Sequence, residues 1–291
     1  MTTILAIDLG GTNMRAGLAK GAAGALVGVE NAAAPTSRDE FLARVWALIE
    51  RHGATHLGIG VPGLAQGSVT SWIPNLGFLD GLDLAVAFPG LSIGLGNDAQ
   101  LALLAEAGQG AAKGSRDAIL LSIGTGIGSA VLAGGRIVRG SRGAACSFGW
   151  ACADPEDAGS ERNGWLERHA SGTALDAAAK TIGFEDARAL IGAAKGGDPA
   201  AAGMLHAAMR RLGSTLAGAV GLLNPEMIVV AGGLAAEMEL LGPMISAALD
   251  RQLPPHLRKL PIRAGAFGPR AGLIGAAIAG MQGPDWGSID G

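Results

Sequence analysis

The sequence predicts an α/β protein made of two related lobes that face each other across a cleft. A strand, a loop tipped by glycine and threonine, and a second strand at residues 4–19 have a counterpart at residues 119–133. A unit that recurs at the start of each half is typical of folds built from two similar lobes. The length of 291 residues also fits two lobes, because it exceeds one ordinary domain core and is short for three. We place the boundary near residue 112, in the glycine-rich stretch 108–114.

The first lobe is expected to alternate strands and helices. Strands are predicted at residues 4–8, 14–19, 25–29 and 91–95, with another ending at residue 60. Ser37 and Glu40 form a capping box, and apolar residues recur at helical spacing over residues 41–49, so a helix is predicted there. A second helix is expected to follow strand 91–95 and to run to about residue 106.

The second lobe is expected to become mainly helical after its hairpin. The predicted elements are a two-residue turn at 134–135, a helix from about 164, a long helix after Pro199, strands at 227–230 and 262–266, and a helix from 271. The tail from Gln282 is expected to fray. The predicted domains are therefore residues 1–112, completed by the C-terminal helix 271–282, and residues 113–270.

Composition excludes several classes of protein. Hydrophobic residues make up 49% of the chain and charged residues 16%, which argues against disorder. The net charge of -3, without any lysine- or arginine-rich block, argues against nucleic-acid and acidic-membrane partners. Two cysteines cannot form a disulfide framework. No signal peptide is expected, because Asp8 interrupts the first apolar run. We expect a cytoplasmic protein.

One apolar stretch has nearly the length of a membrane span. Residues 118–135 carry no charge. Gly124, Gly126 and Gly128 would weaken a helix at its centre, whereas two β-rich runs around a Gly-Thr-Gly loop favour a buried hairpin. We therefore expect no membrane association.

The loop after the first strand has the chemistry of a phosphate site. Gly10 and Gly11 let backbone N–H groups approach oxygen atoms closely, and Thr12 adds a hydroxyl donor. Asp8, just before the loop, could hold Mg²⁺ through water. An ordinary tight hairpin is the alternative interpretation.

The second loop repeats this chemistry at Gly124, Thr125 and Gly126. Two such loops favour a polyphosphate held from both lobes. This loop does not match the GxGxxG fingerprint of dinucleotide-binding proteins. The third glycine, Gly128, is misplaced for that motif, and a strand rather than a helix is expected to follow. A P-loop is disfavoured because no Gly-Lys-Ser/Thr sequence occurs.

Asp98 is the candidate catalytic residue. The sequence Gly96-Asn97-Asp98 lies where a strand ends and a helix begins, which is a common place for a functional carboxylate in α/β proteins. A helix N-cap is the structural alternative. An aspartate at this position can accept a hydroxyl proton during phosphoryl transfer.

These and other motifs together resemble the ROK family of bacterial sugar kinases, within the actin/hexokinase-like (ribonuclease H-like) fold. The matching motifs are Asp8-Leu9-Gly10-Gly11-Thr12, Val61-Pro62-Gly63, Pro74-Asn75, Asn97-Asp98-Ala99, Gly124-Thr125-Gly126-Ile127-Gly128, Leu223-Asn224-Pro225-Glu226, Gly232-Gly233 and Ala271-Gly272-Leu273-Ile274-Gly275-Ala276-Ala277. They occur in the family's order along nearly the whole chain.

The resemblance implies ATP and Mg²⁺ as nucleotide and cofactor, with a sugar bound beside them. It implies the following roles: Asp98 as catalytic base; Asn75, Asn97 and Glu167 as sugar ligands; Gly10, Gly11, Thr12, Asn13, Gly124, Thr125 and Gly126 at the phosphates; and Gly232 and Gly233 at the adenosine.

The chain also departs from the family pattern. Ser147 and Trp150 stand where a glutamate and a histidine usually hold the sugar. Trp150 could stack on a sugar ring or simply fill space. The cysteine-rich zinc loop is missing, so no structural zinc is expected, and Cys146 and Cys152 are interpreted as small core residues.

The predicted function is ATP-dependent transfer of the γ-phosphoryl group to a sugar hydroxyl, expected to be O6 of a hexose, as in a glucokinase. An N-acetylhexosamine kinase, for N-acetylglucosamine or N-acetylmannosamine, is the second interpretation. A non-catalytic sugar-binding regulator is the third, although the first hairpin begins at residue 4 and leaves no room for a preceding helix-turn-helix. A homodimer is expected.

Overall fold

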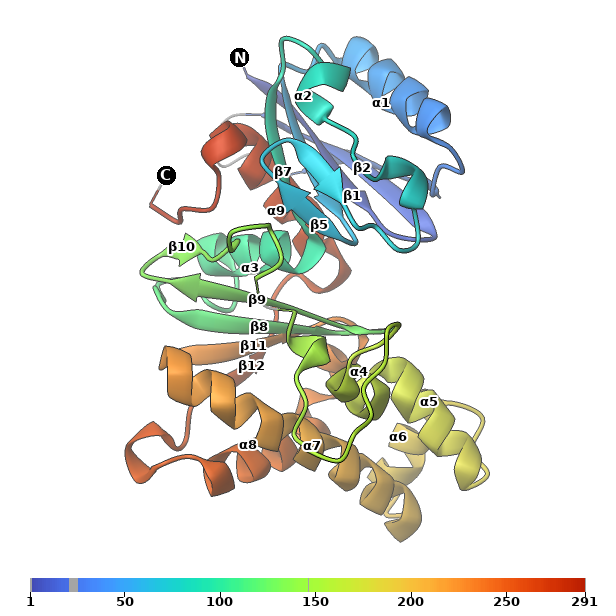
Figure 1. The fold of residues 1–291 in the computed structure, drawn as a ribbon, viewed down its shortest axis with the longest axis vertical. Coiled ribbons are helices and arrows are strands. Elements are labelled where there is room, and N and C mark those ends of the chain that lie inside the picture. The colour runs from blue at the N-terminus through green and yellow to red at the C-terminus, as the bar shows by residue number, and fades with distance from the viewer. Residues whose placement is uncertain (1, 21–25, 146, 291) are drawn as a thin grey trace. The chain divides into compact units, whose positions relative to one another are not determined.

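The computed structural model describes residues 2–20, 26–145 and 147–290, which form two compact α/β units (Figure 1). The first unit comprises Met1–Gly114, Gly135–Ala145 and Pro269–Gly291, and the second comprises Ser115–Gly134 and Cys146–Gly268. The segment Gly135–Ala145, which the predicted domains assigned to the second lobe, packs with the first unit. Its Ile137 N–H donates to the Gly287 carbonyl over 2.7 Å.

The first unit is built on a sheet in the order β3-β2-β1-β4-β7. The strands are β1 (Thr3–Leu9), β2 (Asn13–Lys20), β3 (Val27–Ala33), β4 (His56–Val61) and β7 (Ser92–Asn97). The first three are antiparallel, and β4 and β7 run parallel to β1. The carboxyl ends of β1, β4 and β7 therefore meet at one edge, where functional residues gather in open α/β sheets.

Helices and short elements complete this unit. They are α1 (Arg38–His52), the hairpin β5 (Leu64–Gln66) and β6 (Val69–Ser71), η1 (Gly77–Leu79), α2 (Leu84–Ala87), α3 (Asp98–Gln109), β10 (Arg136–Ile137), η5 (Gly268–Arg270), α9 (Ala271–Gln282) and η6 (Gly283–Asp285). In α1, Phe41, Val45 and Ile49 form the buried face. The predicted cap is present: the Ser37 hydroxyl accepts the Glu40 N–H, but the Glu40 carboxylate reaches Thr36 rather than Ser37.

Helix α9 lies unusually close to its neighbours because glycines line the contact. A Cβ on Gly58 of β4 would overlap the Ala276 carbonyl, and a Cβ on Gly94 of β7 would overlap that of Ala279. On α9 itself, a Cβ on Gly275 would overlap the Leu101 carbonyl of α3. The sheet, α3 and α9 thus pack backbone against backbone. Gly58, Gly94 and Gly275 therefore serve close packing rather than a turn.

The second unit places helices on a sheet in which its own strands follow the order β9-β8-β11-β12, with β10 as the next strand beyond β9. The strands are β8 (Ala118–Ile123), β9 (Ile127–Ala133), β11 (Met227–Ala231) and β12 (Ile262–Ala264). The helices are η2 (Phe148–Trp150), α4 (Trp165–Ala170), α5 (Gly172–Thr181), α6 (Ala187–Lys195), α7 (Pro199–Leu223), η3 (Gly233–Glu237), α8 (Met238–Gln252) and η4 (Pro255–Leu257). Long α7 and α8 lie side by side (Figure 1), and Gly213 of α7 permits their close contact.

The apolar stretch 118–135 forms the β8-β9 hairpin, as predicted. None of the helices in the described part of the chain combines the length and apolar character needed to cross a bilayer.

The prediction of a frayed tail is wrong. Residues after Gln282 form η6, and the Trp286 side chain is buried, with 1% of its surface exposed. Its indole N–H donates to the Leu95 carbonyl of β7 over 2.8 Å, and its ring packs against Gly96. The Arg139 guanidinium lies 5.2 Å from the ring centre, a cation–π distance. One buried indole therefore fixes the tail beneath the strand that leads to Asp98.

Candidate active site

The β1-β2 loop is a tight hairpin tip next to a second polar loop. The Gly10 N–H donates to the Asn13 carbonyl over 2.8 Å, and the Asn13 amide donates to the Thr12 hydroxyl over 3.0 Å. A Cβ on Gly11 would lie 3.0 Å from the Asn75 Cβ. The structure therefore brings Asn75 against the loop. Gly11, Thr12 and Asn13 remain exposed to solvent.

Asp8 lies at the end of β1, with 18% of its side chain exposed. Burial raises the pKa of its carboxyl, and the nearby Arg15 guanidinium opposes that rise. Arg15 Nη1 lies 3.5 Å from Asp8 Oδ2 and donates to the Pro269 carbonyl over 2.7 Å. This ion pair was not predicted from the sequence. The signal was available, because counting back from the hairpin tip places Asp8 opposite Arg15.

Asp98 is the first residue of α3, and Asn97 is the N-cap. The Asn97 Oδ1 accepts the Ala99 N–H over 3.0 Å, while its Nδ2 donates to the Gly63 carbonyl over 2.9 Å. Capping of α3 therefore does not require Asp98, which was the structural alternative for that residue. The Asp98 Oδ1 also receives the Ala99 N–H, over 2.7 Å.

The Asp98 carboxyl has a strongly shifted pKa. Part of the residue is open to solvent, yet the surrounding protein displaces enough water to raise the pKa to about 6. The hydrogen bond from the Ala99 N–H opposes this rise, and the Asp8 carboxylate adds to it by repulsion. A carboxylate with a raised pKa is a better proton acceptor than an ordinary aspartate.

The acidic pair can attract a divalent cation. Burial raises the pKa of both the Asp8 and the Asp98 carboxyl above 3.8, and repulsion from Asp8 raises that of Asp98 further. Mg²⁺ prefers oxygen ligands and usually binds through one or two carboxylates, waters and phosphates. The donor chemistry at Asp8 therefore fits a water-mediated Mg²⁺. Among the described residues, no group of three or more acidic, histidine or cysteine side chains could enclose a metal alone.

The loop that carries Asn75 is held rigidly by polar contacts. The Asp80 carboxylate accepts the Ile73 N–H over 2.7 Å, and Arg38 donates to the carbonyls of Phe78 and Asp80. Trp72, just before this loop, has a left-handed φ of 45° and is 53% exposed. A bulky residue rarely adopts this backbone conformation, and such residues often mark functional sites. The sequence analysis assigned no role to Trp72 or Asp80.

In the second unit, the β8-β9 loop is fastened to the start of α5. The Gly172 N–H donates to the Gly124 carbonyl over 2.7 Å, and the Thr173 hydroxyl donates to the Thr125 carbonyl over 2.8 Å. These bonds fix the loop, and Thr125 at its tip is exposed to solvent.

Glu167 of α4 contacts this same loop. Its Oε1 accepts the Ile127 N–H over 3.0 Å, and a Cβ on Gly126 would overlap that oxygen. The structure therefore brings two predicted site residues together. One Glu167 oxygen has a structural partner, so only the other is fully available to a sugar.

Gly232 and Gly233 follow β11 and differ in environment. Gly232 has φ 80°, and a Cβ there would lie 2.5 Å from the Ile123 carbonyl, so it is required for packing against β8. A Cβ on Gly233 would meet nothing within 4 Å. Both glycines are exposed, and Gly233 has open space where a side chain would stand.

Ser147 and Trp150 flank the short η2 turn. The Phe148 N–H donates to the Ser129 hydroxyl of β9 over 3.0 Å, which fixes the turn to the sheet. Ser147 is exposed, and Trp150 is 39% exposed, so its indole is not a space-filling core residue. Gly164 lies directly against Trp150, which places this turn at the start of α4.

Comparison with known proteins identifies the family. Residues 4–282 match the model of the ROK family. The chain belongs to the ROK family. It is 28% identical to the glucokinase of Streptomyces coelicolor, over 95% of this chain and 97% of the relative. It is 30% identical to the N-acetylmannosamine kinase of Escherichia fergusonii, with the same two coverages.

A solved relative confirms the fold class predicted for this ROK protein. The ROK family glucokinase from Streptomyces griseus, in complex with glucose and AMPPNP, matches with a TM-score of 0.79 and 27% identity. The match covers 97% of this chain and all of the relative. The chain thus has the α/β actin/hexokinase-like fold.

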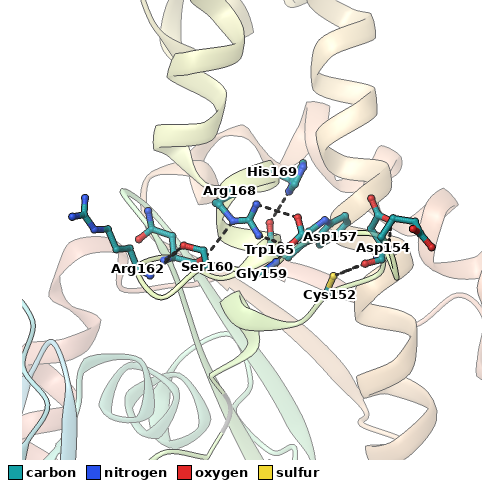
Figure 2. A network of polar contacts seen from close by, with 11 residues as sticks. Cys152, Asp154, Asp157, Gly159, Ser160, Arg162, Trp165, Arg168 and His169 are labelled. Atoms are coloured by element: carbon teal, nitrogen blue, oxygen red, sulfur yellow. Dashed lines mark hydrogen bonds and ion pairs between the residues drawn. The ribbon is translucent and has the colours of Figure 1, made fainter.

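The segment before α4 of this ROK protein is held by an ion pair rather than by clustered thiols (Figure 2). The Arg168 guanidinium contacts both Asp157 oxygens, at 2.7 and 3.1 Å. This bidentate pair lowers the pKa of Asp157 through the hydrogen bonds from Arg168 and Gly159. The Cys152 thiol is exposed and contacts only the Asp154 backbone, so its interpretation as a core residue is wrong. Cys146 lies outside the described residues.

Proposed function

We propose that this ROK-family kinase transfers the γ-phosphoryl group of ATP to O6 of a hexose, as a glucokinase does. The observation that carries the proposal is Asp98, a carboxylate with a raised pKa that α3 does not need as its cap. The two glycine-threonine loops support a polyphosphate ligand. Relatives named glucokinase, one of them in complex with glucose and AMPPNP, support ATP and glucose as the substrates.

In the proposed mechanism, Asp98 accepts the proton of the attacking hydroxyl. The sugar oxygen forms a bond to the γ-phosphorus while the bond to the β,γ-bridging oxygen breaks, and ADP leaves. Positioning and charge neutralisation supply most of the catalysis in phosphoryl transfer. The backbone N–H groups around Gly11 and Thr125 would stabilise the negative oxygens.

Mg²⁺ held through water by Asp8 would neutralise charge on the phosphate oxygens. Arg15 has a distinct task in this proposal: its guanidinium opposes the rise in the pKa of the Asp8 carboxyl that burial causes. Arg15 is therefore a positioning residue rather than a phosphate ligand.

The sugar would be held by the side chains that keep free hydrogen-bonding capacity. Asn97 has one amide hydrogen and one lone pair left after its two structural bonds. Glu167 has one unoccupied oxygen, and Asn75 is exposed beside Gly11. These groups support recognition of a polyhydroxylated ligand.

A second candidate substrate is an N-acetylhexosamine. The exposed Trp150 indole offers an apolar face beside Ser147, and such a face suits the methyl group of an acetamide better than a hydroxyl. The 30% identical relative named N-acetylmannosamine kinase supports this alternative.

The function is tested by measuring ADP release with hexoses, N-acetylhexosamines and polyols. We expect turnover with a hexose, and 6-phosphorylation is checked by NMR of the product. Preference for an N-acetylhexosamine would support the second candidate. Sugar binding without turnover in the presence of Mg-ATP would contradict the kinase proposal and support a regulator.

We predict that Ser147→Glu combined with Trp150→His shifts kcat/KM toward glucose relative to the best other substrate. Carboxylate and imidazole groups hydrogen-bond hydroxyls more strongly than a serine and an indole do. The ratio of kcat/KM values is measured for both proteins. An unchanged ratio in a folded variant would remove these positions from the sugar pocket.

A further inference from the structure

A pocket in the second unit concentrates positive charge away from the glycine-threonine loop. It has a volume of about 430 Å³ and lies between α7, α8 and the segment before α4. Its possible donors are Arg210, Arg211, Arg251, His206, Ser214 and Gln252. A volume of this size falls in the range of small-molecule sites.

The three arginines lack acidic partners. Helix α7 runs for 25 residues without an aspartate or glutamate, so Arg210 and Arg211 have no acidic neighbour one turn away. On α8, the residues three and four positions before Arg251 are alanines. Within the described residues, none of the three guanidinium groups has an ion pair or hydrogen bond.

Among the described residues that line the pocket, Asp154 is the one acidic residue, and its Oδ1 already accepts the Glu156 N–H over 3.0 Å. The cluster therefore carries a local positive charge in a protein whose net charge is -3. The three arginines are exposed to solvent, and a pocket lined by charges of one sign raises the local concentration of counter-ions, here anions.

We propose that this pocket binds a small anion that carries a phosphate group. A guanidinium presents parallel N–H donors that match phosphate oxygens, and three of them suit a dianion better than a single carboxylate. Ser214 and Gln252 can complete the hydrogen bonds of a phosphate ester. Inorganic phosphate and a hexose phosphate share this chemistry.

The bound anion would touch the helix that holds Glu167. Trp165 lines the pocket and begins α4, two residues before Glu167 (Figure 2). Trp165 is buried, and its ring stacks on His169 with centres 4.5 Å apart. Occupancy of the pocket therefore acts on the same helix that fixes the β8-β9 loop.

The test is isothermal titration of the full chain with inorganic phosphate and with glucose 6-phosphate, at constant ionic strength. The pocket variant is Arg210→Gln with Arg251→Gln. Its matched control is Arg188→Gln with Arg263→Gln, which removes two exposed arginines of the same unit. We expect the pocket variant to weaken binding at least tenfold and the control to leave it unchanged.

A second variant, Thr12→Ala with Thr125→Ala, separates this site from the glycine-threonine loops. We expect it to retain the binding that the pocket variant loses. Tighter binding of glucose 6-phosphate than of phosphate would identify a sugar ester as the ligand, and equal binding would identify free phosphate. Absence of saturable binding, or binding that survives the pocket variant and is lost from the threonine variant, would overturn the proposal. Melting curves of all variants verify that they are folded.

Discussion

At the residue scale, Asp98 combines features that a purely structural aspartate would not need. The cap of α3 is Asn97, and burial raises the pKa of Asp98 to about 6, which disfavours the charged form of this residue in the folded protein. A residue that costs stability and is accessible to solvent fits a functional role.

We predict that Asp98→Asn lowers turnover by roughly 100- to 10,000-fold, the usual effect of losing a general base. The same change is expected to raise the melting temperature at pH 7 to 8. The folded-state pKa of about 6 lies above the unfolded value of 3.8, so the stability contributed by this group is present below pH 3.8 and is lost as the pH rises through 6. Near-normal turnover would remove Asp98 from the mechanism. A difference in melting temperature between variant and wild type that is the same at pH 4 and at pH 8 would contradict the shifted pKa.

The raised pKa also predicts the pH dependence of activity. Asp98 must be ionised to accept a proton, so kcat/KM should fall about tenfold for each pH unit below about pH 6. Initial rates at fixed ionic strength from pH 4.5 to 8 measure this profile. An acid limb near pH 4 would indicate that the carboxyl behaves as an ordinary aspartate in the free enzyme.

At the element scale, the local patterns were predictable and the long-range contacts were not. Both hairpins and the α1 cap follow from signals within a few residues, and the structure confirms them. Arg168 bonds to Asp157, which lies 11 positions away in the sequence. Trp286 bonds to Leu95, which lies 191 positions away. Nothing in local spacing indicates such partners, which is why the tail was predicted to fray.

The glycine packing of α9 gives a prediction at this scale. Gly275→Ala should destabilise the first unit by about 1–3 kcal/mol, because the new methyl group would overlap the Leu101 carbonyl and separate α3 from α9. Gly218→Ala, in exposed α7, is the matched control. It meets no atom within 4 Å and should stabilise by about 0.5–1 kcal/mol. Urea unfolding measures both, and the same sign for the two changes would contradict the packing argument.

At the scale of the whole molecule, the first unit is made from both ends of the chain. Its sheet comes from residues before 98, while α9 and the tail come from residues after 270. That helix 271–282 completes the first lobe was predicted from the sequence. The role of the residues beyond Gln282 required the structure.

We predict that Trp286→Ala destabilises the first unit by about 3–5 kcal/mol, the usual cost of removing a buried aromatic ring. Trp286→Phe should cost less, since it keeps most of the ring and loses mainly the bond to Leu95. Turnover should fall with the alanine variant because Gly96 and the start of α3 lose their support. Denaturation followed by circular dichroism and activity measures both effects, and a stable, fully active alanine variant would show that the tail is dispensable.

The position of α9 also sets an order of events during synthesis. Domains generally fold as units while the chain emerges from its N-terminus. Here the strands that end at Asp8 and Asn97 are translated first, but the helix that covers them is translated after the whole of the second unit. A nascent chain can therefore complete the second unit before the first. Until α9 has left the ribosome, the face of β4 and β7 that it covers stays exposed, and chaperones are the natural protection for it.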